Sequence, residues 1–173
     1  MRSLQSMPQL LVPLLAQVML WSQEPHYRDL DSVELFAGAM MITRNMVRNK
    51  QASISFDIEY SITEDICSSV GFAESLHGIL RVRPKGSIWG APVCSSWGFI
   101  GRKGTARTKE RPSGNSSPRT KNANRMVVLT TLLFLAAYVR GCHIWLEQPV
   151  ISLMRECSPL KDLGYIIISI CNF

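Results

Sequence analysis

The chain has 173 residues, of which 46% are hydrophobic and 18% charged. This composition argues against a disordered chain and is sufficient for one globular domain with its own core. The net charge of +6 comes from residues 101–125, because eight basic residues and one acidic residue fall there and the remaining residues sum to about −1.

The amino-terminal 30 residues predict an extension or a helix outside the main domain. The apolar run LLVPLLAQVMLW at 10–21 has the length of a signal-peptide core, but Pro13 interrupts it and no small-x-small cleavage site follows. Five cysteines, an odd number without any C-x-x-C pair, indicate neither a disulfide framework nor a zinc ribbon. The three histidines are scattered, so no metal site is expected. We therefore expect an intracellular protein, compatible with the nucleus, rather than a secreted one.

Strands and helices alternate through the first half of the chain. The apolar run at 32–40 ends in Ala-Gly and predicts a strand, which the helical pattern of 41–50 follows. The β-branched segment 52–60 predicts a second strand that closes on an aspartate. Helical spacing returns at 69–82, and the short apolar segment 86–92 predicts a third strand.

The second half begins with a polar, basic segment and then resumes the alternation. Residues 98–122 are rich in Gly, Ser, Thr, Pro and cations, which predicts a loop. The elements expected after it are a helix at 123–139 capped by Gly141, a strand at 142–149, a short helix at 150–157 and a strand at 164–173.

This order of elements predicts an α/β fold. Nearly continuous apolar strands that alternate with helices are typical of a doubly wound, mostly parallel, Rossmann-like sheet with helices on both faces. We expect this domain to span 31–173, with 98–122 inserted in it. The apolar run 126–139 is too short to cross a bilayer and lies between Arg125 and Arg140, so no stable membrane insertion is expected.

Ligands of such sheets bind at the carboxyl ends of the strands. Four features fall there: the Phe36-Ala-Gly38 turn, Asp57, Cys94 and Glu147. A glycine turn lets a cofactor approach the backbone, and a carboxylate after the second strand can accept from both ribose hydroxyls of a nucleoside. We expect Gly38, Asp57, Cys94 and Glu147 to line one cavity.

The segments VELFAGAM, FDIEY, EDI, GAPVCSSW and WLEQP resemble successive motifs of S-adenosylmethionine-dependent methyltransferases of the DNA cytosine-5 type. The resemblance covers roughly residues 32–155. It implies S-adenosylmethionine as the cofactor, with the methionine end at Phe36 and Gly38 and the ribose at Asp57. The remaining cofactor positions that it implies are Asp65, Ile66 and Pro92.

The resemblance also implies a mechanism and a nucleic-acid partner, with DNA favoured over RNA. Cys94 would add to C6 of a cytosine that has left its stack, while Glu147 holds the base. The cations of the basic segment would neutralise phosphates without reading sequence. Those expected to contact phosphates are Arg102, Lys103, Arg107, Lys109 and Arg111.

Several positions depart from the family's pattern. Met40 stands where a second glycine is usual, Val93 separates Pro92 from Cys94, and Gln148-Pro149 follows Glu147. About five strands are predicted where the family has seven, and the downstream Q-x-R-x-R motif is not found. The resemblance therefore implies a divergent or incomplete relative. The alternative is a catalytically inactive nucleic-acid-binding or scaffold protein of the same fold, and the sequence leaves the oligomeric state open.

Overall fold

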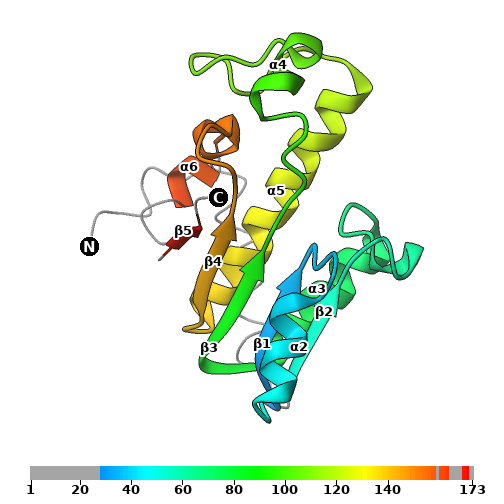
Figure 1. Ribbon diagram of the computed structural model, residues 1–173, viewed down its shortest axis with the longest axis vertical. Coiled ribbons are helices and arrows are strands. Elements are labelled where there is room, and N and C mark those ends of the chain that lie inside the picture. Colours follow the sequence, from blue (N-terminus) through cyan, green and yellow to red (C-terminus); the bar gives the residue numbers. More distant parts are fainter. Residues whose placement is uncertain (1–27, 159, 164–168, 172–173) are drawn as a thin grey trace.

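A single parallel sheet organises the protein. The computed structural model describes residues 28–158, 160–163 and 169–171. Within them, five strands lie in the order β2-β1-β3-β4-β5, and every neighbouring pair is parallel (Figure 1). The strands are β1 (Leu30–Leu35), β2 (Ser53–Phe56), β3 (Val82–Gly90), β4 (His143–Glu147) and β5 (Ser169–Cys171). The predicted α/β fold with a parallel sheet is therefore confirmed.

Helices lie on both faces of this sheet. The helical elements are α2 (Met41–Arg48), η2 (Ile62–Glu64), α3 (Ser69–Arg81), α4 (Phe99–Thr105), α5 (Pro118–Val139), η3 (Leu153–Glu156) and α6 (Leu160–Leu163). Helices α3 and α5 pack against each other and cover one face, whereas α2 packs on β1 and β2 from the other side (Figure 1). Side chains of ideal strands alternate between the faces, so the two faces of the sheet have different chemistry.

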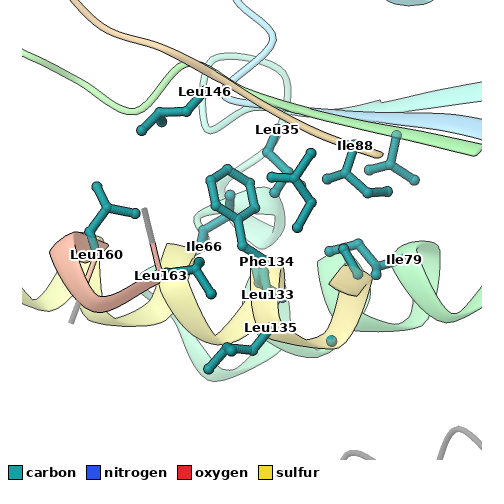
Figure 2. Packing of buried hydrophobic residues seen from close by; sticks show 14 of the residues in the cluster. Leu35, Ile66, Ile79, Ile88, Leu133, Phe134, Leu135, Leu146, Leu160 and Leu163 are labelled. Carbon is teal, nitrogen blue, oxygen red and sulfur yellow. The ribbon is translucent and has the colours of Figure 1, made fainter. Parts of the chain in front are cut away.

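The face toward α3 and α5 carries the core. Val33 and Leu35 of β1 alternate with polar neighbours, and the register places Ile88 beside Val33. Leu35 and Ile88 point from the sheet toward Phe134 of α5 (Figure 2). A Cβ on Gly90 would lie 2.7 Å from the Phe134 ring, so the missing side chain at Gly90 makes room for that ring.

The opposite face carries a polar and aromatic row. The register aligns Glu34 of β1 with Trp89 of β3, and Trp89 with Trp145 of β4. The two indole rings stack, with centroids 4.9 Å apart and planes 9° from parallel. This row lies beside α2 and reaches the carboxyl edge of the sheet.

The main correction to the sequence-based elements concerns the basic segment 98–122. It is a loop only at 106–117, because α4 occupies 99–105 and α5 already begins at Pro118. Ser117 caps α5 by accepting from the Thr120 N–H, and Pro118 suits the first helical turn because it has no N–H to satisfy.

Smaller differences concern the ends of elements. Strand β3 begins at Val82, directly after α3, and the helix predicted at 150–157 is the 3₁₀ turn η3. Arg140 is the C-cap of α5, and Gly141 directly after it has a φ of 73°, as expected of a glycine that ends a helix. Residues 1–27 of the predicted amino-terminal extension lie outside the described residues. Of the last predicted strand, only Ser169–Cys171 are described.

Helix α5 alone, among the described helices, is long and apolar enough to cross a bilayer by composition. Half of its most apolar 18-residue window is buried inside the fold. Leu133, Phe134 and Ala136 are completely buried among sheet residues. The apolar character of α5 is therefore explained by its place in the core.

Candidate functional site

The carboxyl ends of four strands meet at one edge of the sheet. The register aligns Phe56, Leu35, Gly90 and Leu146 across neighbouring strands. The residues that follow each of them are therefore neighbours along this edge: Asp57, Phe36, Ala91 and Glu147. The direction in which strands are added reverses between β1 and β3, and such a switch point is where open α/β sheets bind ligands.

The turn after β1 and the end of β2 are joined by a hydrogen bond. The Gly38 N–H donates to Oδ2 of Asp57 at 2.9 Å, and the Glu59 N–H donates to Oδ1 at 2.9 Å. Gly38 has φ of +46°, and a Cβ placed on it would meet nothing within 4 Å. Open space above a left-handed glycine is a place where a ligand can approach the backbone closely. Two of the sequence-predicted cofactor residues are thus brought together.

Phe36 and Met40 in the same turn also have left-handed backbones, with φ of 59° and 54°. Residues other than glycine adopt this region at a cost, so both must be held in it by their surroundings. The Met40 N–H donates to the Ala37 carbonyl at 2.7 Å, which closes the turn. Position 40 is therefore left-handed although a methionine occupies it.

Glu34 was not predicted to have a role. It is 7% exposed, and its carboxylate accepts from the Thr43 N–H at 2.7 Å and from the Ile42 N–H at 3.3 Å. Met40 provides no side-chain cap for α2, so Glu34 of the adjacent strand satisfies these amide groups instead. A negative charge at this end of a helix is also favourable to the helix dipole. The only sequence signal was an acidic residue inside an apolar strand.

Asp65 and Ile66, the predicted adenine contacts, lie after η2. Oδ1 of Asp65 accepts from the Cys67 N–H at 2.9 Å, which forms a local turn. Ile66 is buried in the hydrophobic core. Gly71 of α3 lets the helix approach, since a Cβ there would lie 2.1 Å from the Asp65 carbonyl oxygen. Asp65 keeps partial solvent access, whereas the side chain of Ile66 belongs to the core.

Cys94 lies in a closed turn after β3. Its carbonyl oxygen accepts from the Trp97 N–H at 2.9 Å and from the Gly98 N–H at 3.0 Å, and its side chain is half-buried. The preceding Pro92 is buried, and its carbonyl accepts from Nε2 of Gln148 at 2.6 Å. The buried amide of Gln148 in turn accepts from the Ser152 hydroxyl at 2.9 Å. Gln148 therefore holds the cysteine turn against the end of β4.

A small pocket of about 100 Å³ opens to solvent at the switch point. It is lined by Glu34, Leu35, Ile42, Trp89, Gly90, Ala91, Trp145 and Glu147. Of the four residues expected to share one cavity, only Glu147 lines this pocket. Gly38 and Asp57 lie at the turn after β1, and Cys94 lies three residues beyond the lining residue Ala91. The hydrogen bonds to Gln148 and Trp97 fix the Cys94 turn in this position. A cavity shared by all four residues stays a prediction.

The basic segment divides into one buried cation and several exposed ones. Arg107 is 3% exposed, and its guanidinium carbon lies 3.3 Å from the Trp97 ring centroid. It donates to the Ser96 carbonyl at 3.1 Å and to Oδ1 of Asn124 at 2.8 Å. Burial lowers the pKa of Arg107 to about 10. This position corrects its predicted role as a phosphate contact, because its donors are used inside the protein.

Lys103, Lys109 and Arg111 are exposed, and Arg102 is half-exposed. Arg119, Lys121 and Arg125 near the start of α5 are exposed as well. The side chain of Arg102 donates to the Ile151 carbonyl, which joins α4 to the segment after β4. The charge seen in the sequence is thus carried by the outer surface of α4, of the connection to α5 and of the first turns of α5.

The other described cysteines are free thiols in more apolar surroundings. Burial raises the pKa of Cys142 to about 11, and it raises the pKa values of Cys157 and Cys67 as well. A raised pKa keeps these thiols protonated and poorly nucleophilic near neutral pH. Across the part of the chain that the structure describes, no three His, Cys, Asp or Glu side chains gather as a metal would require.

These features define an α/β protein with a parallel sheet, a small open pocket at the switch point and a basic, partly helical insertion beside it. No protein-family model matches the chain, and no curated protein or solved structure is significantly similar to it. The function is therefore argued from the geometry of the site and from the sequence motifs.

Proposed function

We propose that this chain binds S-adenosylmethionine at the carboxyl edge of its sheet and takes part in methyl transfer to C5 of a cytosine in nucleic acid. The observation that carries the proposal is the hydrogen bond between the Gly38 N–H and the Asp57 carboxylate. It joins the two segments whose motifs resemble the methyltransferase cofactor site, next to the switch point of the sheet.

The residues of this turn fit the proposed cofactor in two respects. Gly38 has free space on the side where a Cβ would be, and Asp57 is half-exposed with two of its lone-pair sites in use. The remaining carboxylate lone pairs can accept from ribose hydroxyls. Bound there, S-adenosylmethionine would supply an electrophilic methyl group.

The protein's own contribution to the chemistry would come from Cys94 and Glu147. The thiolate of Cys94 would form a bond to C6 of the base, which makes C5 nucleophilic toward the methyl group. Loss of the C5 proton to a base, with breakage of the bond between sulfur and C6, would then release the methylated cytosine and the free Cys94 thiolate. Glu147 is exposed at the end of β4 and lines the pocket, so its carboxylate can accept from the amino group of a base. Gln148 would hold the Cys94 turn in place through Pro92. An intracellular location, compatible with the nucleus, belongs with this proposal as a prediction.

A second candidate is a nucleic-acid-binding relative without catalysis. The specific observation in its favour is that Cys94 does not line the pocket that holds Glu147. The methionine at the left-handed position 40 favours it too, because its side chain stands where the family leaves the backbone bare.

Calorimetric titration with S-adenosylmethionine tests the cofactor site. We expect binding that Asp57→Ala abolishes, while Glu59→Ala, which changes the neighbouring exposed carboxylate, leaves it unchanged. Asp57→Asn separates charge from structure, because its amide oxygen can still accept from the Gly38 N–H. A chain that gives no heat at millimolar cofactor contradicts the proposal.

Transfer of a labelled methyl group to DNA separates the two candidates. We expect Cys94→Ala to keep cofactor binding and to lose transfer by at least about 10³-fold, since the nucleophile is gone. Cys67→Ala, which removes another half-buried thiol, serves as the matched control. Cofactor binding without transfer by the unaltered chain would favour the non-catalytic candidate.

A further inference from the structure

Five large apolar side chains are exposed around the Cys94 turn. Phe99 is 70% exposed and Ile100 is 92% exposed. Val93, Val150 and Ile151 are each more than half exposed. We call these five residues the apolar rim. An exposed apolar cluster beside a candidate site marks an interaction surface rather than part of the core.

Three contacts hold the segments of the apolar rim together. Gln148 donates to the carbonyl of Pro92, next to Val93. The side chain of Arg102 donates to the Ile151 carbonyl, and the Leu153 N–H donates to the Trp97 carbonyl at 3.2 Å. The turn after β3, the start of α4 and the segment after β4 are therefore fixed against one another.

The inner side of α4 explains why Phe99 and Ile100 face solvent. A Cβ on Gly101 would lie 2.0 Å from the Ser95 carbonyl oxygen, so the helix is seated directly on the backbone of the cysteine turn. Four residues later on the same side, the Thr105 hydroxyl donates to the Ser96 carbonyl at 3.2 Å. With that side of α4 fixed inward, Phe99 and Ile100 cannot rotate into the protein.

Exposed and half-exposed cations follow the α4 part of the apolar rim in the chain. Arg102 and Lys103 follow directly in α4, and Lys109 and Arg111 lie in the connection to α5. Glu110 is the one acidic residue between 101 and 125, so this surface is complementary to a polyanion. Nucleic acid offers a polyanionic backbone and, between its bases, apolar faces against which such side chains can insert.

We propose that Phe99 and Ile100 act as an apolar wedge that makes the protein prefer nucleic acid with a locally unstacked base over a perfect duplex. The inference rests on the proposed nucleic-acid function and names its preferred substrate class. Cations around the rim hold the phosphates, and the wedge occupies the space next to an unpaired base. A perfect duplex must first be opened at that point, whereas a bulge or mismatch is already weakened there.

Fluorescence anisotropy with the full-length chain, in the absence of cofactor, tests this preference. The probes are a labelled 20-base-pair DNA duplex and the same duplex with one bulged cytosine. We expect the unaltered chain to bind the bulged duplex about tenfold more tightly. The double variant Phe99→Ser/Ile100→Ser should bind both probes equally, with its affinity for the perfect duplex little changed.

Two controls keep the result specific. Val47→Ser/Val70→Ser removes two exposed apolar residues from α2 and α3, away from the rim, and should keep the tenfold preference. Lys103→Gln/Lys109→Gln should weaken binding to both probes by a similar factor, because phosphate contacts carry no information about stacking. Thermal unfolding of each variant confirms that it is folded.

Equal affinity of the unaltered chain for the two probes would overturn the wedge. So would a preference that survives Phe99→Ser/Ile100→Ser. Sedimentation with vesicles of phosphatidylserine and phosphatidylcholine that depends on Phe99 and Ile100, without a bulge preference, would assign the rim to a membrane surface instead. The cofactor titration is independent: its failure with the bulge preference intact removes the methyltransferase proposal and leaves the wedge.

Discussion

At the scale of single residues, the turn after β1 is distinguished more by its backbone conformation than by its side chains. Phe36, Gly38 and Met40 all have positive φ, at alternate positions of one short turn. Only Gly38 adopts this conformation without a steric cost from a side chain. This turn is also where we propose that the methionine end of the cofactor binds, so backbone conformation and proposed function depend on the same residue.

Replacing Gly38 tests that dependence. Gly38→Ala should lower the free energy of unfolding by about 1 kcal/mol, because a left-handed alanine is strained although its Cβ meets no neighbour. The matched control is Gly104→Ala, because Gly104 also has open space around a Cβ placed on it but lies within α4 and has no positive φ. This change should raise the free energy of unfolding by up to about 1 kcal/mol, since alanine favours the helix more than glycine does. Urea denaturation measures both. Equal effects of the two changes would show that φ is not the cause.

At the scale of elements, the basic insertion is built on a buried arginine. Arg107 donates to carbonyls of three separate segments, at Ser96, Pro112 and Thr120. It therefore connects the cysteine turn, the α4–α5 connection and the start of α5. Its hydrogen-bond partners are neutral groups, and its guanidinium lies over the Trp97 ring, so hydrogen bonds and cation–π attraction stabilise its charge.

Replacing Arg107 should loosen the whole insertion. Arg107→Met leaves several buried acceptors without donors, and we expect a loss of at least about 3 kcal/mol in the free energy of unfolding. Amide hydrogen exchange should become faster between residues 96 and 120. Arg111→Met, which alters an exposed arginine of the same segment, should change stability by less than about 0.5 kcal/mol. Unchanged exchange in Arg107→Met would contradict the connecting role.

Elements with a clear apolar period followed from local patterns, whereas α4 did not. Helix α3 was predicted within one residue of its bounds because its apolar residues recur at helical spacing. In the structure, the Ser68 hydroxyl caps it by accepting from the Gly71 N–H. Helix α4 was missed because its seven residues contain two glycines and no apolar periodicity. What makes it helical is its contact with the turn at Ser95, which is a tertiary interaction.

At the scale of the whole molecule, α5 can pack closely on the sheet because Gly90 has no side chain. Gly90 of β3 stands opposite the Phe134 ring, so the distance between the two layers depends on both residues. Gly90 is also the last residue of β3 and lines the switch-point pocket. The fit of α5 against the sheet therefore affects the position of the candidate site.

A double-mutant cycle tests this match. Gly90→Ala should lower the free energy of unfolding by about 2 kcal/mol, because its Cβ would lie 2.7 Å from the ring. Combining it with Phe134→Leu should recover at least about 1 kcal/mol relative to the sum of the single changes. Additive effects would mean that the two residues do not constrain each other.

The sequence by itself determined the parallel α/β fold and the approximate place of each strand, since apolar runs and helical periodicity are local properties of the chain. It also placed Phe36, Asp57 and Glu147 at one edge, because parallel strands share the direction of their carboxyl ends. Only the tertiary structure decided that Arg107 is buried, that Glu34 caps α2 and that Cys94 lies outside the pocket. Each of these depends on contacts between segments distant in the sequence, and residue type and spacing do not encode such contacts.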